Sequence, residues 1–506
     1  MPQKARGPGA RRTLVAVVPP HRIAATMRFA GWHGWTRLLH LDYYRAEMSG
    51  RASDDTKTAT QEETVLPRSG PRRVAVLLVV GRAAEGGGAA EGESVIPFED
   101  AIEIGRNPQC GRYGTVCCLS DTRVSGRHAS VSRTRDGFRI TDLDSKNGTR
   151  VDGRPISTAT KVDDGALLFV GGTALVLRLL SEEALAAIRE DLAAPFGPVA
   201  TLSGNMATPI RRLRRLAATD EAILLSGETG VGKEVYARAV HRASGRRGRF
   251  VTINCATLPT DLVESELFGF ARGAHAQAAA GKPGLVEEAQ HGTLFFDEIG
   301  EMPSAAQAKL LRFLDDRKYV PLGAGEARTM DVRVIGASSS IVEDQQSQGV
   351  RRDLLARFGA SPVVLPPLRE RREDVGTLVR HFLGQPRGLL VSRLETAAFL
   401  ALCLHDWPQN VRELEKVMAE AALGADGKPE IRLVDLPARL QERVTVEASS
   451  TDHPARRERP DKAELEALLE RHKGSVAQVA RKLDRQWGVV WRWLQQSGID
   501  AKKYRR

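Results

Sequence analysis

Cysteine is scarce in this chain of 506 residues. The five are Cys110, Cys117, Cys118, Cys255 and Cys403. They show no paired Cys-x-x-Cys spacing, and histidines do not cluster beside them, so the sequence predicts no structural zinc site. Few cysteines without a pattern are typical of proteins that work in a reducing cytosol.

Long hydrophobic runs are absent too. No apolar stretch approaches the roughly 20 residues that a membrane-spanning helix needs. Near the N-terminus, the run from Thr13 to Val18 is stopped by Pro19 and Pro20, and it is too short for a signal peptide. We therefore expect a cytoplasmic protein without a membrane partner.

Charge is unevenly spread along the chain, whose formal net charge is +11. Residues 1–51 hold nine Lys and Arg against two Asp and Glu, and residues 456–506 hold fourteen against seven, so the part between them is net acidic. Basic ends favour nucleic-acid binding, because neutralising phosphates releases counterions. The same charges also suit a solvated surface.

Changes in composition and periodicity divide the chain into domains. Short β-type runs separated by turns, such as Val74–Val80, Phe138–Thr141 and Ala166–Val170, predict an all-β sandwich. Apolar strands then alternate with helical stretches, which is the pattern of a parallel α/β domain. The predicted boundaries are a disordered tail at 1–70, the all-β sandwich at 71–180, a linker helix at 181–195, an α/β P-loop ATPase subdomain at 196–365, its helical lid at 366–440, a linker at 441–460 and a small all-α helix-turn-helix at 461–506.

The first 70 residues carry no folding signal. Residues 1–47 lack clean periodicity, and two interpretations remain open: a disordered tail, or sequence upstream of a start at Met48. The polar segment that follows is rich in threonine among acidic residues and reads as disordered. Its threonines are Thr56, Thr58, Thr60 and Thr64.

A phosphate-binding loop follows an apolar strand at residues 223–226. The segment has the form GxxxxGK, in which glycines let several backbone N–H groups point at phosphate oxygens and the lysine reaches the terminal phosphates. Ser or Thr usually follows the lysine as a magnesium ligand, whereas Glu234 stands here. The loop predicts an ATP site formed by Gly227, Glu228, Thr229, Gly230, Val231, Gly232, Lys233 and Glu234.

Two acidic residues end a second apolar strand about 60 residues later, in the segment Gly292–Glu298. Parallel strands bring their carboxyl ends to one edge, so Asp297 and Glu298 should lie beside the phosphates. We expect Asp297 to hold Mg²⁺ and Glu298 to polarise the attacking water. The alternative is a buried strand that runs into an acidic turn.

Residues 196–425 resemble the AAA+ domain of the bacterial enhancer-binding proteins, which activate sigma-54 RNA polymerase. The matching segments are GETGVGKE (227–234), INCATLP (253–259), ESELFGFARGA (264–274), GTLFFDEIGE (292–301), RRDLLARF (351–358), LPPLRERREDV (365–375) and WPQNVRELEK (407–416). This family has Glu after the P-loop lysine, as here.

The resemblance implies further roles. Asn254 matches the residue that restrains the catalytic glutamate, and Arg412 matches the lid arginine that senses nucleotide. Arg351 and Arg357 match arginines that reach into a neighbouring subunit's ATP site, where an arginine stabilises charge on the transferred phosphoryl group. The family therefore implies a homo-oligomer, a hexameric ring.

Three departures from the family pattern stand out. The sensor asparagine is replaced within Ala337–Ser339, and Gln409 replaces a glycine before Asn410. The sigma-54 contact loop, Gly-Ala-Phe-Thr-Gly-Ala in the family, loses its Phe and Thr. In this chain it reads Gly273, Ala274, His275, Ala276, Gln277 and Ala278.

Residues 100–155 resemble a forkhead-associated (FHA) domain, a β-sandwich whose loops bind phosphothreonine. The matching segments are IGRN (104–107), VSGRHASV (124–131) and DLDSKNGT (142–149). The resemblance implies that Arg106 and Ser125 bind phosphate and that Asn147 binds the ligand backbone, while His128 braces the loop. The alternative is a sandwich kept for packing. A Ser/Thr kinase acting on the threonine-rich segment, or on another protein, would supply the ligand.

The last 46 residues resemble the Fis-type tail of the same family. Helices are predicted at Leu465–Leu469, Val476–Leu483 and Gln486–Gln496, which fits a helix-turn-helix. Val490 and Leu494 are expected in the core, and Trp491 and Trp493 as packing residues. The candidate DNA contacts are Gln486, Val489 and Arg492 for bases and Lys482 and Arg485 for phosphates, unless the tail only dimerises.

Two functions follow from these patterns. The first is a DNA-bound ATPase regulator of sigma-54 RNA polymerase, gated by phosphothreonine. The second is a sigma-54-independent regulator or phospho-dependent adaptor that uses nucleotide only for assembly. The altered loop at 273–278 separates them.

Overall fold

The computed structural model describes most of the chain beyond the first 72 residues. The described ranges are 73–85, 94–107, 115–257, 259, 262–274, 281–339, 350–359, 361–384, 391–425, 427–442, 460–483 and 487–504. The tail predicted at 1–70, with its threonines and both possible starts, lies outside them. No helix in these ranges is long and apolar enough to cross a membrane.

A β-sandwich forms the first folded part. One sheet has the order β2-β1-β11-β10-β7-β8 and the other β4-β3-β5-β6-β9. Neighbouring strands are antiparallel, except for β3 and β4, which are parallel. The strands are β1 (Arg73–Arg82), β2 (Val95–Phe98), β3 (Ala101–Gly105), β4 (Thr115–Cys118), β5 (Ala129–Arg133), β6 (Phe138–Asp142), β7 (Thr149–Val151), β8 (Arg154–Ile156), β9 (Thr160–Val162), β10 (Leu167–Val170) and β11 (Thr173–Ser181).

Strand β1 is buried on both faces. Successive side chains of a strand point to opposite sides of the sheet. On one side, Ala75, Leu77 and Val79 belong to the core between the two sheets. On the other side, Val76, Leu78 and Val80 join a second core that includes the helices after residue 368. Because both faces of β1 are buried, nearly all of its residues are apolar.

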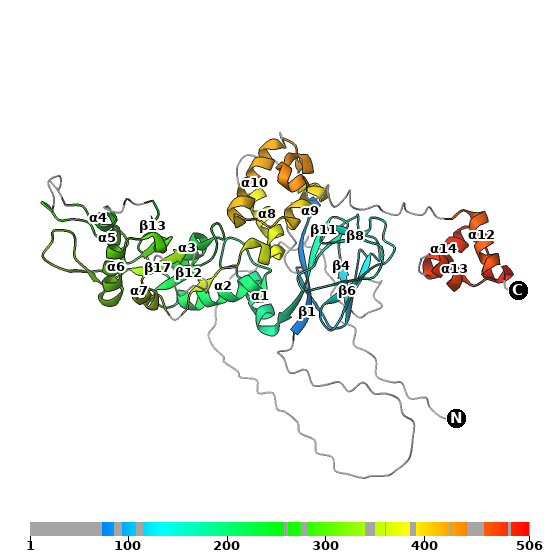
Figure 1. The fold of residues 1–506 in the computed structure, drawn as a ribbon, viewed down its shortest axis with the longest axis horizontal. Helices are drawn as coiled ribbons and strands as arrows, with labels where there is room; N and C mark the ends of the chain where they lie inside the picture. Colours follow the sequence, from blue (N-terminus) through cyan, green and yellow to red (C-terminus); the bar gives the residue numbers. More distant parts are fainter. Residues whose placement is uncertain are drawn as a thin grey trace, which may run out of the picture. The chain divides into compact units, whose positions relative to one another are not determined.

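The α/β domain is built on a parallel sheet with the order β13-β14-β17-β12-β18. Figure 1 shows α2 and α3 beside strands β12 and β17. Apolar residues from the helices and the sheet form two cores, one of which contains Phe295 and the other Phe296. The bounds are α2 (Gly204–Ala217), β12 (Ile223–Ser226), α3 (Lys233–Ala243), β13 (Phe250–Asn254), α4 (Val263–Phe268), α5 (Leu285–Glu288), β14 (Thr293–Asp297), α6 (Ser304–Asp316), β17 (Arg333–Ser338), α7 (Arg352–Arg357) and β18 (Val363–Val364), with a short antiparallel pair of β15 (Lys318–Tyr319) and β16 (Arg328–Thr329).

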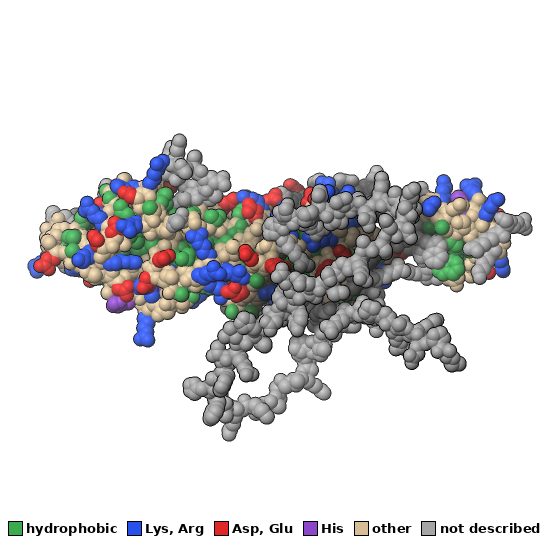
Figure 2. Space-filling view, turned by 90° about the horizontal axis from the view of Figure 1, so that it is seen from below, with side chains coloured by type: hydrophobic (Ala, Val, Ile, Leu, Met, Phe, Trp, Pro, Cys, Tyr) green, Lys and Arg blue, Asp and Glu red, His purple; other side chains and the backbone are tan. Residues whose placement is uncertain are grey.

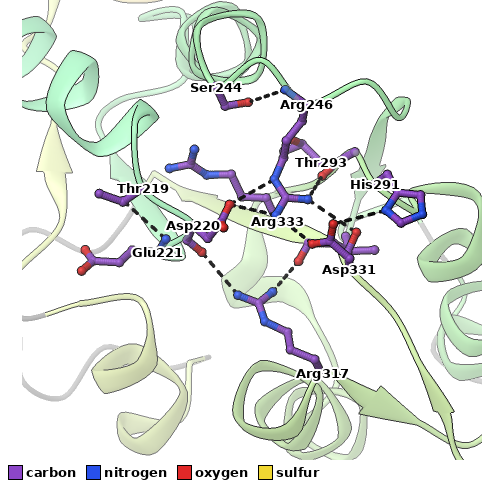
Figure 3. Close-up of polar contacts among 12 residues, drawn as sticks. Thr219, Asp220, Glu221, Ser244, Arg246, His291, Thr293, Arg317, Asp331 and Arg333 are labelled. Atoms are coloured by element: carbon purple, nitrogen blue, oxygen red, sulfur yellow. Dashed lines mark hydrogen bonds and ion pairs between the residues drawn. The ribbon is translucent and has the colours of Figure 1, made fainter.

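Polar residues tie together the edge of this sheet where the strands begin. Arg246 donates to Asp220 and Asp331 at 2.8 Å each, and Figure 3 shows its guanidinium between the two carboxylates. The buried Arg333, at the start of β17, donates to the carbonyls of Leu216 and Ala217 at the end of α2. A cation at these carbonyls complements the helix dipole.

The predicted helical lid is present, but it is not purely helical. Its helices are α8 (Val375–Leu383), α9 (Thr396–Leu404) and α10 (Asn410–Gly424). A short parallel pair, β19 (Arg393–Leu394) with β20 (Glu430–Ile431), lies within the same segment. The linker helix predicted at 181–195 is α1 (Glu182–Ala193), whose first turn is capped by the Ser181 side chain.

The tail forms short helices at the predicted places. They are α12 (Lys462–Arg471), α13 (Val476–Lys482) and α14 (Trp487–Gln496), and side chains of Asp461 and Ser475 cap the first two. Val490 and Leu494 are fully buried, as predicted, and Trp493 packs on this core. Trp491 is 38% exposed, so it fits the predicted role of a packing residue less well than Trp493 does.

Candidate functional site

The P-loop leaves the sheet at the end of β12 and enters α3 at Lys233. Gly227, Gly230 and Gly232 have φ of 152°, 83° and 106°, a region that side chains disfavour. A Cβ at Gly230 would lie 2.2 Å from the carbonyl oxygen of Gln409. This bare backbone at a helix N-terminus fits a triphosphate.

Lys233 lies inside this loop and is buried. Its Nζ donates to the carbonyl oxygen of Gly227 at 2.8 Å and lies 3.4 Å from Oε1 of Glu298. The two sequence motifs therefore meet, as predicted, at the carboxyl edge of the sheet. Glu234, by contrast, turns along its own helix to pair with Arg238 at 2.6 Å.

Asp297 and Glu298 follow directly at the end of β14. Asp297 is half-buried, and its pKa is raised by burial and then by the neighbouring charge of Glu298. A bound Mg²⁺ ion would offset the crowding of these two negative charges. Glu298 has φ of 51°, in the left-handed region that few residues other than glycine adopt.

The Glu298 carboxylate is held by Ser339, which lies in the segment where the sensor asparagine of the family is replaced. Ser339 donates to Oε2 of Glu298 twice, from its backbone N at 3.0 Å and from its Oγ at 2.9 Å. Ser339 follows β17, which lies between β14 and β12 in the sheet. The strand order places this segment, already marked in the sequence by the replaced sensor asparagine, beside Glu298.

Asn254 does not make the contact that the family resemblance implied. It lies in register with Asp297 on the neighbouring strand, but its Oδ1 accepts from the backbone N of Ala256 at 3.0 Å. The Asn254 side chain thus braces the turn after β13 in this structure, and the side chains bonded to Glu298 are those of Ser339 and Lys233.

The lid contacts the P-loop through Glu228. Arg369 donates to both of its carboxylate oxygens at 2.6 and 2.9 Å, and Nδ2 of Asn410 donates to Oε2 at 3.1 Å. These partners lower the pKa of Glu228, with Arg369 as the largest cause. Arg412 lies beside the loop as well, since its backbone N donates to Gly230. Arg369 and Asn410 lie in the segments 365–375 and 407–416 that resemble the family, and the sequence alone does not predict their contact with Glu228.

Gln409 fits its position without strain. Its φ is −103°, which any residue can adopt, and its backbone N donates to Oε2 of Glu413 at 3.1 Å. The missing glycine therefore does not disturb the loop before α10.

The two candidate trans-acting arginines lie at the two ends of helix α7, Arg351 just before it and Arg357 as its last residue. Arg351 makes a two-pronged ion pair with Asp353, at 2.7 and 3.1 Å, and Arg357 pairs with Asp315. Their side chains are 42% and 57% exposed. Both guanidinium groups are thus held at the surface of their own subunit.

The three candidate phosphothreonine-binding residues lie on adjoining loops of the sandwich. The backbone N of Arg106 donates to the carbonyl of Ser125 at 3.0 Å. Oγ of Ser125 accepts from the backbone N of Lys146, next to Asn147, at 2.9 Å. An oxygen that accepts in this way keeps its own O–H for a ligand.

His128 braces this loop, as predicted. It is buried, its Nδ1 accepts from the backbone N of Ser125 at 3.0 Å, and its Nε2 lies 3.1 Å from the carbonyl of Gly148. Burial lowers the pKa of His128, which keeps the ring neutral so that Nδ1 can accept. Arg127 is committed elsewhere, because it pairs with the buried Glu103 at 2.7 and 3.0 Å.

The sandwich is joined to the lid by polar contacts as well as by the shared core. Asn147 donates to the carbonyl of Arg123 at 2.6 Å, and the Arg123 guanidinium contacts Oγ1 of Thr396 on α9. Arg178 of β11 donates to both carboxylate oxygens of Glu373, at 3.0 and 3.1 Å. The residues after Glu373 lead directly into α8.

Several other predicted site residues lie wholly or partly outside the described residues. In the sigma-contact loop, Gly273 and Ala274 are described, whereas His275 to Ala278 are not. In the tail, Gln486 and Arg485 lie outside, and Val489 and Arg492 are placed on α14 without their side chains. Lys482 is exposed at the end of α13, and Figure 2 shows Lys and Arg side chains on the surface of this unit.

Three protein families match consecutive parts of the chain. The FHA domain matches residues 102–171, the sigma-54 interaction domain residues 199–364, and the AAA+ ATPase lid domain residues 369–453. The regulatory protein AtoC of Escherichia coli is 35% identical over 60% of this chain and 68% of its own length. This chain belongs to the sigma-54 interaction family of AAA+ regulators, the bacterial enhancer-binding proteins. It carries an AAA+ ATPase domain behind an FHA domain.

Other relatives in this family are matched over less of their length. The nitric oxide reductase transcription regulator NorR1 of Cupriavidus necator is 41% identical over 57% of this chain and 61% of its own. NtrC of Rhizobium meliloti is 44% identical over 44% and 46%. The chain thus spans less than two thirds of either. A crystal structure of NtrX from Brucella abortus in complex with ATP has 29% identity and a TM-score of 0.43, over 63% of this chain and 74% of that one.

Proposed function

We propose that the chain is a DNA-binding transcriptional regulator of the enhancer-binding type, in which ATP hydrolysis remodels sigma-54 RNA polymerase and phosphothreonine binding to the FHA domain gates the activity. One observation carries the proposal: Lys233 and Glu298 meet at 3.4 Å at the carboxyl edge of the sheet, in a domain of this family.

The geometry of the ATP site supports a role for each of its residues. The glycine-rich loop from Gly227 to Gly232 holds the phosphates with backbone N–H groups, and Lys233 exchanges its contact with Glu298 for the terminal phosphate. Asp297 would hold Mg²⁺, which would neutralise charge on the phosphates. Glu298 then accepts a hydrogen bond from the attacking water. Arg412 senses the nucleotide from the lid.

Each site is completed by a neighbouring subunit in a hexameric ring. Arg351 and Arg357 are held at the surface, and a guanidinium that crosses an interface stabilises charge developing in the transition state. A head-to-tail interface of this kind closes into a ring. The ion pairs with Asp353 and Asp315 would hold both side chains until assembly.

Phosphothreonine gating acts through the lid. A phosphopeptide bound at Arg106, Ser125 and Asn147 touches the loop whose Arg123 contacts Thr396. Since the lid also supplies Arg369 and Asn410 to the P-loop, a shift of the sandwich would alter the nucleotide site. The phosphothreonine comes from another protein or from the threonine-rich segment, after a Ser/Thr kinase has acted.

The alternative is a sigma-54-independent regulator or an adaptor that uses nucleotide for assembly only. The observation in its favour is the loop at 273–278, in which His275 and Ala276 stand where the family has Phe and Thr. For the regulator, the tail binds DNA through Gln486, Val489, Arg492, Lys482 and Arg485.

Transcription from a sigma-54 promoter separates the two functions. The purified chain, at a concentration that gives rings, is added to sigma-54 RNA polymerase with ATP, and open complexes are counted. We expect open complexes that are lost in Lys233→Ala. Hydrolysis that depends on Lys233 but yields no open complexes would instead support the alternative.

A further inference from the structure

A short segment of the lid, residues 368–374, contacts both the FHA domain and the phosphate-binding loop. It is built from two short 3-10 helices, η4 (Leu368–Glu370) and η5 (Arg372–Asp374). Backbone hydrogen bonds of 2.9 to 3.1 Å close both turns. Because the segment is bonded within itself, a displacement on one side of it is passed to the other side more directly than through an open loop.

On the side of the FHA domain, the segment is held by Arg178 of strand β11. Nη2 of Arg178 donates to both carboxylate oxygens of Glu373, at 3.0 and 3.1 Å, and to the carbonyl oxygen of Glu370 at 3.4 Å. The Glu373 side chain is buried, and a buried carboxylate that loses its cation is strongly destabilising. The place of the segment therefore depends on the place of this guanidinium.

Arg178 stands in a row of β11 that is otherwise apolar. Alternate residues of a strand face the same side, and Ala174, Val176 and Leu180 of this row belong to the core that the sandwich shares with the lid. Packing does not require a charge here, since apolar residues in place of a buried ion pair are often neutral or stabilising. The planar guanidinium, with its donors in a fixed fork, adds a defined orientation of the segment.

On its other side, the segment holds the phosphate-binding loop. Arg369 donates to both carboxylate oxygens of Glu228, at 2.6 and 2.9 Å. Nη2 of the buried Arg371 donates to the carbonyl oxygen of Val231 at 2.8 Å. Both acceptors belong to the glycine-rich loop, whose backbone N–H groups bind phosphate only when they point at it. Whatever orients the segment thus also orients these N–H groups.

We propose that Arg178 is a positioning residue for nucleotide binding: the FHA domain supplies a cation that orients residues 368–374, and this segment in turn fixes the phosphate-binding loop. The contribution is present without a phosphopeptide, and in this it differs from the gating proposed above. It rests on nucleotide binding by the ATPase domain, and neither on sigma-54 activation nor on phosphothreonine recognition.

Titration of the full chain with a fluorescent ATP analogue, N-methylanthraniloyl-ATP, tests this. Arg178→Met combined with Glu373→Leu removes the ion pair without leaving an unpaired charge, so the thermal midpoint should stay near that of the wild type. The affinity for the analogue should nevertheless fall at least about fivefold. Arg178→Lys keeps the charge but not the fork, and its affinity should lie between those of the wild type and the double variant.

A matched control makes the same two substitutions in another ion pair. Arg211→Met with Glu190→Leu removes a contact of 3.1 Å between α2 and α1, away from the 368–374 segment, and should leave the affinity unchanged. Lys233→Ala gives the background signal. If the wild-type signal equals that background, nucleotide binding itself fails, and the proposed function falls together with this inference.

The route of the effect is tested by adding Arg369→Met, which breaks the contact of the segment with Glu228. If Arg178 acts through the segment, the two losses of affinity share one cause. The triple variant should then lose less than the product of the separate fold-changes. A loss equal to the full product would place the effect of Arg178 elsewhere and overturn the proposal.

The affinity of the double variant decides the remaining cases. A folded double variant that binds the analogue as tightly as the wild type, or more tightly, would show that the ion pair serves only the stability of the joint. If the double variant is unfolded before nucleotide is added, Arg178→Lys decides in its place. Wild-type affinity in that variant would overturn the proposal.

Discussion

At the scale of single residues, His128 carries a prediction on pH dependence. Its Nδ1 accepts from Ser125, so the ring must be neutral in the fold, and burial lowers its pKa below the ordinary 6.5. The folded state then binds fewer protons than the unfolded state. The stabilisation from a neutral His128 is present above about pH 6.5 and is lost as the pH falls through the lower pKa of the folded state.

We therefore expect the urea midpoint of the sandwich to fall between pH 7 and pH 5. His241 also has a pKa lowered by burial, so the wild-type slope alone is not diagnostic. The His128→Gln variant should show a flatter slope than the wild type. Equal slopes in the two proteins would contradict the assignment.

Arg106 is the residue on which phosphate binding should depend most. It is exposed, and its backbone is fixed to the Ser125 loop. Arg106→Ala removes a charge-assisted contact of about 1.5–3 kcal/mol, or roughly tenfold to a hundredfold in affinity. Calorimetric titration with a phosphothreonine peptide measures this. Arg139→Ala, an exposed arginine on β6 of the same sandwich, should bind as the wild type does.

At the scale of elements, the joint between the sandwich and the lid is the unexpected part of the structure. The Arg178–Glu373 pair is largely buried, with Glu373 only 1% exposed. Arg178→Met leaves an unpaired buried carboxylate and should destabilise the joint by about 3–5 kcal/mol. Replacing both partners, in Arg178→Met with Glu373→Leu, should recover most of that loss.

Hydrogen exchange in β11 and α8 reports on this joint. The single variant should exchange faster in both elements, and the double variant should be close to the wild type. If the single and double variants were equally unstable, the ion pair would not be what holds these elements together.

The same elements mark how far prediction from the sequence could go. The strands at Val74 and Phe138 and the helices of the tail were predicted closely, because each has its own periodicity and turn signals. The P-loop and the Asp297–Glu298 pair met as expected, because parallel strands end at one edge. The contact of Arg123 with Thr396 has no local signal, because the two residues are 273 positions apart.

At the scale of the whole molecule, the proposed ring makes each ATP site the property of two subunits. A Glu298→Gln subunit can still offer its arginines, and an Arg357→Ala subunit can still offer its glutamate. Each variant alone should be inactive. In an equal mixture, about a quarter of randomly formed interfaces pair an intact glutamate with an intact arginine.

Hydrolysis by the mixture should therefore rise to about that fraction of the wild-type rate. The mixture is compared with each variant at the same total concentration. A mixture no more active than its parts would show that Arg357 serves its own subunit or none.

Strand β1, buried on both faces, has a consequence for how such a regulator can be rearranged in evolution or in the laboratory. Its Val76, Leu78 and Val80 pack in one core with residues of the lid, so the FHA domain is not structurally independent of the ATPase domain. Separating the FHA domain from the ATPase domain would expose an apolar surface on each fragment to water. Replacing this FHA domain with another would require a matching replacement of the lid surface. The two parts are thus expected to be inherited together.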